Sequence, residues 1–70
     1  MTTAGFNVKR IIAERGLKQG AVAKKAGYTE KAFSNMLNGR KIISALDIVK
    51  ISAVLGVTPN DLLNTQGESL

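Results

Sequence analysis

The 70-residue sequence lacks cysteine and histidine altogether, and only 4% of its residues are aromatic. Without cysteine there is neither a disulfide bond nor a thiolate metal site, and a cytosolic location is permitted. Without histidine the commonest catalytic base and metal ligand is missing as well. The five carboxylates are not closely paired in sequence, so no nucleophile and base are arranged for catalysis. We therefore expect no enzymatic activity, no metal site and no cofactor.

Long apolar runs are absent too. No segment approaches the roughly 20 residues that a membrane span needs, and the opening stretch MTTAGF lacks the charged and then apolar form of a secretory signal. The basic groups fall on polar helices without a Trp, Phe or Leu face to insert into lipid. We therefore expect a cytoplasmic protein that does not bind membranes.

The composition that is present suits a compact soluble fold, because 44% of the residues are hydrophobic and 21% are charged. A chain of this length forms one small domain, and it buries only about 60% of its unfolded surface, so the core is thin. The net charge is +5, and it is unevenly spread. Residues 1–41 carry nine basic and two acidic side chains, whereas residues 42–70 carry one basic and three acidic ones.

A basic half on a small domain favours a polyanionic partner, nucleic acid first and acidic lipid second. The alternative is a solvated basic surface that serves solubility alone. Charge by itself leaves both open.

Start and stop signals divide the chain into five short helices. We expect Asn7 to cap the first, with Phe6 and Ile11 as a hydrophobic staple, and Gly16 to end it. The other four are predicted over about residues 19–26, 30–37, 45–55 and 59–64, capped in turn at Thr29, Ser44 and Thr58 for the last three. No segment alternates apolar and polar residues over the length of a strand. The predicted fold class is all-α, with a domain over residues 1–64 and a short, polar, frayed C-terminal tail over residues 65–70.

The two helices over residues 19–26 and 30–37 are joined by only three residues, so they must cross steeply. Such a crossing needs a small residue where the backbones meet, which is Ala23, and a turn residue that tolerates positive φ, which is Gly27. The apolar positions that hold this pair against the rest of the chain are Val22, Ala26, Tyr28, Phe33 and Met36.

This pattern resembles the lambda-repressor-like helix-turn-helix family, of the Cro, phage-repressor and xenobiotic-response-element type. The resemblance runs from about Asn7 to Leu63 and rests on Leu17, Gln19, Val22-Ala23, Gly27, Thr29, Phe33, Asn38-Gly39-Arg40, Leu55-Gly56-Val57 and Leu62. It implies a five-helix domain whose third helix enters the major groove of double-stranded DNA, and a homodimer that spans two half-sites. It also implies a bacterial or phage-encoded protein that is nucleoid-associated when bound.

The resemblance implies base contacts for Glu30, Lys31, Ser34 and Asn35. The chemistry of the side chains agrees: Lys31 can donate to guanine O6 and N7, Asn35 can pair bidentately with adenine, and Glu30 can accept from cytosine N4. For Glu30 the alternative is a first-turn acid that only offsets the helix dipole.

The resemblance also implies phosphate contacts for Gln19, and the same role is expected of Lys18, Asn38, Arg40 and Lys41. Backbone amides at the starts of the second and third helices would add to these contacts. Lys24 and Lys25 are interpreted as a solvated face. The glycine-rich stretch over residues 16–27 lacks the Gly-Lys-Ser/Thr ending of a phosphate loop, so no nucleotide site is expected.

Two departures from the family pattern stand out. Ile12 and Leu37 occupy positions where many members pair an arginine with a glutamate, so an apolar contact replaces an ion pair. Apolar residues beyond the needs of the core also follow the third helix, and they are predicted to form a dimer interface: Ile42, Ile43, Leu46, Val49 and Val54. For Ile43 the alternative is that it tucks under the fourth helix. No small-molecule ligand is predicted.

Two function hypotheses follow. The first is a transcriptional regulator, a repressor above all, that binds an inverted-repeat operator as a dimer formed in solution or only on DNA. The second is a protein-binding adaptor, such as a phage antagonist or an antitoxin, that keeps the fold without reading an operator. A regulator would lose its function without Gln19, Asn35 and Arg40. An adaptor would tolerate their loss and would depend on Ile42 and Val49.

Overall fold

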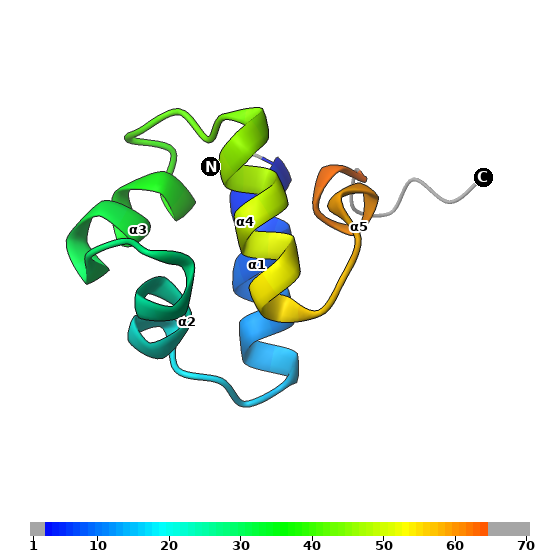
Figure 1. Cartoon of the computed structure of the whole chain (residues 1–70), viewed down its shortest axis with the longest axis horizontal. Helices are drawn as coiled ribbons and strands as arrows, with labels where there is room; N and C mark the ends of the chain where they lie inside the picture. The colour runs from blue at the N-terminus through cyan, green and yellow to red at the C-terminus, as the bar shows by residue number, and fades with distance from the viewer. Residues whose placement is uncertain (1–2, 65–70) are drawn as a thin grey trace.

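Five helices make up the part of the chain that the computed structural model describes, residues 3–64 (Figure 1). Their bounds are α1 Thr3–Glu14, α2 Gln19–Ala26, α3 Glu30–Leu37, α4 Ala45–Leu55 and α5 Pro59–Leu63. No strand occurs within these residues, and the all-α prediction is confirmed. The predicted tail over residues 65–70 lies outside the described residues, so the domain boundary stays a prediction.

Hydrogen bonds from the predicted cap residues start the later helices. The Thr29 hydroxyl accepts from the Ala32 N–H at 3.1 Å at the start of α3. Ser44 and Asp47 cap α4 reciprocally, since each side chain binds the other's backbone N–H, and α5 starts with an equivalent pair. Such boxes satisfy two N–H groups that have no partner within the helix. The sequence therefore predicts these three boundaries correctly.

The start of α1 differs from the prediction. The helix begins before Asn7, whose side chain is 1% exposed and donates through Nδ2 to the carbonyl oxygens of Leu62 and Asn64, both at 2.8 Å. Asn7 therefore satisfies carbonyls at the end of α5, a partner more than 50 residues away that no local pattern reveals. The predicted staple is wrong for the same reason, because Phe6 and Ile11 both lie inside the helix.

The first turn of α1 is held by close contact with α3. A methyl group placed on Gly5 would lie 2.5 Å from the carbonyl oxygen of Leu37, so only glycine permits this approach. Ile12 and Leu37, the two positions at which an apolar contact is expected, are both buried in the core. Both side chains belong to the same apolar cluster.

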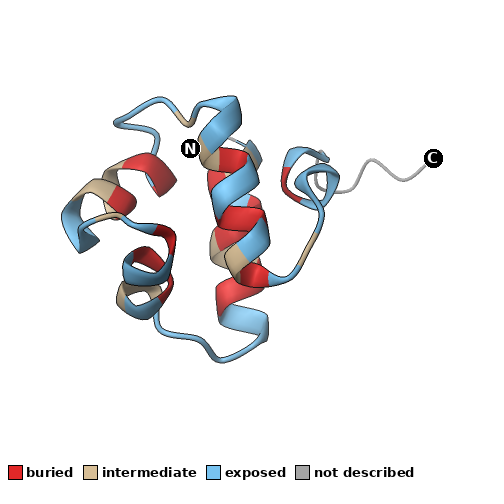
Figure 2. Ribbon diagram, viewed as in Figure 1, coloured by how far each residue is buried: buried red, intermediate tan, exposed pale blue. Residues whose placement is uncertain are grey.

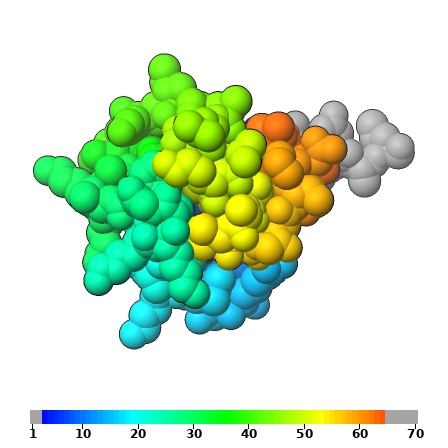
Figure 3. All heavy atoms as spheres, in the orientation of Figure 1, coloured from blue at the N-terminus to red at the C-terminus, as the bar shows by residue number. Residues whose placement is uncertain are grey.

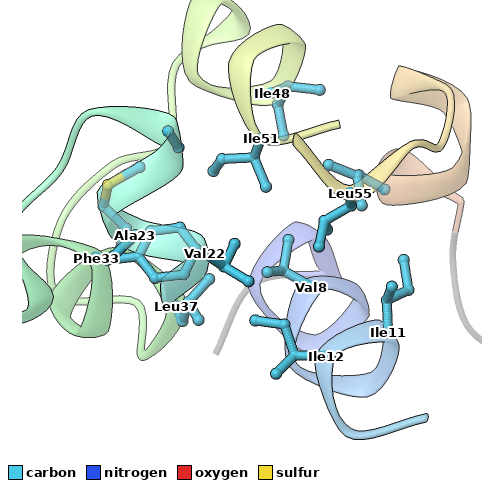
Figure 4. Close-up of a cluster of buried hydrophobic side chains, with 13 residues drawn as sticks. Val8, Ile11, Ile12, Val22, Ala23, Phe33, Leu37, Ile48, Ile51 and Leu55 are labelled. Carbon is cyan, nitrogen blue, oxygen red and sulfur yellow. The ribbon is translucent and has the colours of Figure 1, made fainter. Parts of the chain in front are cut away.

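The buried residues form one apolar cluster to which all five helices contribute (Figures 2 and 4). Its members are Val8, Ile11, Ile12, Val22, Ala23, Ala26, Phe33, Met36, Leu37, Ile48, Ile51, Leu55 and Leu62. In Figure 1, α4 crosses in front of α1, with α2 and α3 on one side and α5 on the other. Within residues 3–64 no helix has the length and apolar character needed to cross a membrane.

Candidate nucleic-acid interface

The turn between α2 and α3 has the geometry that the sequence predicts. Gly27 ends α2 at φ +89°, a left-handed conformation that glycine adopts without strain. Its N–H donates to the Lys24 carbonyl at 3.1 Å, and the Tyr28 N–H donates to the Ala23 carbonyl at 2.9 Å. Ala23 is fully buried beneath this turn. A rigid three-residue connection therefore fixes the angle between the two helices.

α3 divides into a buried face and an open face. Phe33, Met36 and Leu37 are completely buried. On the other side Glu30 and Lys31 are exposed, and Ser34 and Asn35 are partly exposed. Residues three or four positions apart share one side of a helix, so the structure brings the predicted base-contacting residues together.

The loop after α3 places two more of the predicted residues beside this face. The N–H groups of Arg40 and Lys41 both donate to the Asn35 carbonyl, at 2.8 and 3.2 Å. The side chains of Arg40 and Lys41 are exposed. The end of α3 and the two cations therefore form one continuous surface.

Asn38, a predicted phosphate contact, has partners within the protein. Its Oδ1 accepts from Lys9 Nζ, and its Nδ2 donates to Ser34 Oγ at 3.3 Å. The first of these bonds connects α1 to the end of α3. No local sequence pattern predicts it, because the two residues are 29 positions apart. The phosphate role of Asn38 stays a prediction.

The start of α2 differs from the starts of α3, α4 and α5. Its N-cap residue is Lys18, which makes no side-chain capping hydrogen bond. Gln19 and Gly20, the first helical residues, are partly exposed. The first N–H groups of a helix attract anions, and here no side-chain cap satisfies them.

The basic side chains separate into two groups. Four have partners: Lys9 binds Asn38, Arg10 binds Glu14 at 3.2 Å, Arg15 binds the Leu55 carbonyl, and Lys50 lies 4.6 Å from the centre of the Tyr28 ring. Within residues 3–64 the other six have no such partner, and they are Lys18, Lys24, Lys25, Lys31, Arg40 and Lys41. All six lie on α2, on α3 or in the segments that flank them. The uncompensated positive charge is therefore concentrated on the two-helix unit.

A polar cluster that the sequence analysis missed joins this unit to α4. The Tyr28 hydroxyl donates to Asp47 Oδ1, and the Tyr28 ring stacks on Phe33 at 5.9 Å between centroids. Burial and the Asp47 carboxylate raise the pKa of Tyr28 to about 12. The Tyr28 hydroxyl and the Ser44 N–H lower the pKa of Asp47 below its usual value. Because Asp47 also caps α4, this cluster fixes the start of α4 against the turn.

The predicted dimer residues fall into two sets. Ile42, Leu46 and Val49 are exposed, and Ile42 is 86% exposed. Ile43 and Val54 instead pack against the core, which agrees with the alternative interpretation of Ile43. A surface hollow of about 270 Å³ lies beside Ile42, and its walls come from Ala4, Gly39, Arg40, Lys41, Ile42, Ile43, Ile48 and Leu63. In the space-filling view the outer side of α4 is uncovered between the α2–α3 unit and α5 (Figure 3).

This fold and this surface define a helix-turn-helix DNA-binding domain. The profile of the Cro/C1-type HTH DNA-binding domain matches residues 7–68. The chain belongs to this family. No curated protein matches the sequence.

Proposed function

We propose that the protein is a sequence-specific, double-stranded DNA-binding transcriptional regulator, and that it acts as a repressor. The observation that carries this proposal is the position of the six unpartnered cations, which all lie on α2, on α3 or in the segments that flank these two helices. Clustered basic groups bind the phosphate backbone and release counterions. We further propose a cytoplasmic, bacterial or phage-encoded protein, with binding rather than catalysis as its activity.

In the proposed complex α3 enters the major groove. Lys31 donates to guanine, Asn35 pairs with adenine, and Ser34 adds a hydroxyl contact. Glu30, at the first position of α3, meets a base that offers a donor, cytosine N4. These contacts specify the sequence.

The phosphate contacts flank α3 on both sides. Lys18 and Gln19 meet the backbone at the start of α2, and Arg40 and Lys41 meet it after α3. These contacts position the domain without reading bases. Asn38, which Lys9 and Ser34 already hold, completes the set.

Two copies are proposed to bind an inverted repeat as a dimer. The copies contact each other through Ile42, Leu46 and Val49, and Ile43 and Val54 support these residues from the core. Exposed apolar side chains so close together are costly in water and are typical of a contact surface. A two-fold dimer pairs the same surface of each copy. Whether the dimer forms before or on DNA depends on how much area these few residues bury.

The test is selection of bound duplexes from a random pool at about 150 mM salt, a physiological ionic strength. An enriched inverted repeat with half-site centres about 10 base pairs apart supports the dimeric regulator. Enrichment of a single half-site removes the dimer and keeps the DNA reader. A pool that stays random, from protein shown to be folded, contradicts sequence-specific binding.

The exposed apolar residues of α4 and of the segment before it also favour a second candidate, the protein-binding adaptor. An adaptor would bind its partner through Ile42 and Val49 and would tolerate the loss of Gln19, Asn35 and Arg40. Substitutions on the two surfaces separate the candidates. Loss of Gln19, Asn35 or Arg40 disables the regulator and not the adaptor, whereas Ile42→Asp or Val49→Asp disables the adaptor.

A further inference from the structure

The side chain of Glu30 does not point away from the protein. A methyl group placed on Gly20 would lie 2.8 Å from Glu30 Cδ and 3.1 Å from each carboxylate oxygen. The carboxylate therefore rests on the surface of α2, in the space that the missing side chain of Gly20 leaves open. Within residues 3–64 it makes no hydrogen bond or ion pair.

This position brings a negative charge to the first turn of α2. Gly20 is the second residue of that helix, and the cap residue Lys18 contributes no side-chain hydrogen bond. A carboxylate near a helix start is favoured by the helix dipole. The starts of α3, α4 and α5 instead receive hydroxyl groups, from Thr29, Ser44 and Thr58.

The proposed function places a DNA phosphate at the same end of α2, next to Lys18 and Gln19. A phosphate at that place and the Glu30 carboxylate repel each other, because both are negatively charged. Any DNA that docks must therefore displace the carboxylate from Gly20 or bear the repulsion. This cost does not depend on the base sequence.

We propose that Glu30 determines specificity by exchanging its position over Gly20 for a base contact. Every base pair offers one amino group in the major groove, but its position depends on the sequence, so on most sequences the displaced carboxylate meets an acceptor or a phosphate instead. On the operator it accepts from an exposed amino group such as cytosine N4. This inference rests on the proposed function, and it makes Glu30 a residue that weakens binding to the wrong DNA more than it strengthens binding to the right DNA.

A residue that only reads a base behaves differently. Its loss weakens operator binding and leaves binding to unrelated DNA unchanged. Loss of the Glu30 charge instead strengthens binding to unrelated DNA. The two roles therefore predict different results on a duplex that lacks the operator, no change for the first and tighter binding for the second.

The experiment measures the dissociation constants of the wild type and of Glu30→Gln on the selected operator and on a scrambled duplex. Glu30→Gln keeps the shape of the side chain and removes its charge. We expect it to bind the scrambled duplex about fivefold more tightly, as removal of one charge repulsion in water implies. The ratio of operator to scrambled affinity falls by at least that factor. The gain on scrambled DNA shrinks as salt rises, because exposed charges are screened.

The matched control is Glu14→Gln, which makes the same change of net charge on α1, where Glu14 pairs with Arg10. It should leave the affinity ratio unchanged. Glu30→Ala provides a second variant with the same expected direction, and circular dichroism establishes that each variant is folded. An unchanged or weaker affinity of both Glu30 variants for scrambled DNA overturns the proposal while the regulator function stands. Failure of the wild type to bind either duplex overturns both.

Discussion

The charged side chains of the α2–α3 unit and those of the α4–α5 half of this domain differ in whether they have partners within the protein. In the first, Lys18, Lys31 and Arg40 have no partner among the described residues. In the second, both acidic residues of the described part, Asp47 and Asp61, cap a helix. The first surface thus carries cations without a partner in the protein. On the second the carboxylates bind helix N–H groups, and apolar side chains are exposed to solvent. The proposed function accordingly assigns a different partner to each surface, DNA to the first and a second copy of the chain to the second.

The two regions nevertheless share a core. Phe33 of α3 and Ile51 of α4 are both fully buried in the same cluster. Tyr28 and Asp47 join them again at the surface. The α2–α3 unit and the α4–α5 half therefore differ in their surfaces, while the shared core stabilises both.

Phe33→Ala should have the largest effect, because it removes a fully buried ring that stacks on Tyr28. We expect a loss of about 3–5 kcal/mol in the free energy of unfolding. Urea titration followed by circular dichroism measures it, with Phe33→Leu as a milder control. A variant in which α4 and α5 stay folded while α2 and α3 melt would show that the regions are separate folding units.

Val49→Asp should act on assembly. It places a charge on the exposed side of α4, where we propose the dimer contact, and burial of an unpaired charge is costly. Binding to an inverted repeat should weaken about 100-fold as linked binding is lost, while binding to a single half-site stays unchanged. The control is Ala13→Asp, which introduces the same charge at an exposed position of α1. Equal loss on both duplexes would place Val49 in the DNA contact instead.

Lys31→Ala and Arg40→Ala test the division within the DNA-binding surface. Loss of Lys31 should cost about 1–3 kcal/mol on the preferred operator and relax one base position. Loss of Arg40 should weaken all sequences alike. For the wild type, the logarithm of the binding constant should fall with the logarithm of the salt concentration with a slope of about −7, if each subunit of the dimer neutralises about four phosphates. Arg40→Ala should make this slope shallower. If both variants behave alike, the assignment of Lys31 to base contact is wrong.

Asp47→Asn should have the smallest effect on stability, about 1 kcal/mol, because it weakens one helix cap. Its pH dependence is more informative. The folded pKa of Asp47 is lowered, so its contribution to stability is present above the usual carboxyl pKa and is lost as the pH falls below it. The raised pKa of Tyr28, about 12, works in the opposite direction. That contribution is present below pH 10, the ordinary value, and is lost as the pH rises toward 12.

Thermal melts at several pH values measure both effects. The wild type should lose stability in acid more steeply than Asp47→Asn, and at high pH more steeply than Tyr28→Phe. Absorbance titration of the phenol in the wild type gives the Tyr28 pKa directly. A pKa near 10 for this residue would contradict the contact with Asp47.

The local rules of capping and turn chemistry determined most of the element boundaries from the sequence. Thr29, Ser44 and Thr58 start helices because each binds an N–H three residues away. Gly27 ends α2 because it adopts positive φ without strain. Such signals act over a few residues, so a sequence displays them completely.

The sequence also located the candidate surface, but it did not give the arrangement of all its side chains. It placed the predicted base-contacting residues on one helix, and the structure agrees on which face is open. The contacts of Asn38 with Lys9 and of Glu30 with Gly20 were not anticipated. They join residues on different helices, and their partners depend on how those helices pack.

Composition, spacing and capping by themselves determined that this chain is all-α and basic, and the residues of its two-helix unit carried the resemblance to the helix-turn-helix family, since these features depend on neighbours along the chain. Tertiary structure alone decided that the Asn7 side chain binds a carbonyl of α5 and does not cap its own helix, because α1 and α5 meet only once the core has formed. It alone joined Tyr28 to Asp47, 19 residues further on. It also decided which of the apolar residues after α3 face solvent, because burial is set by the packing of α4 on the other helices.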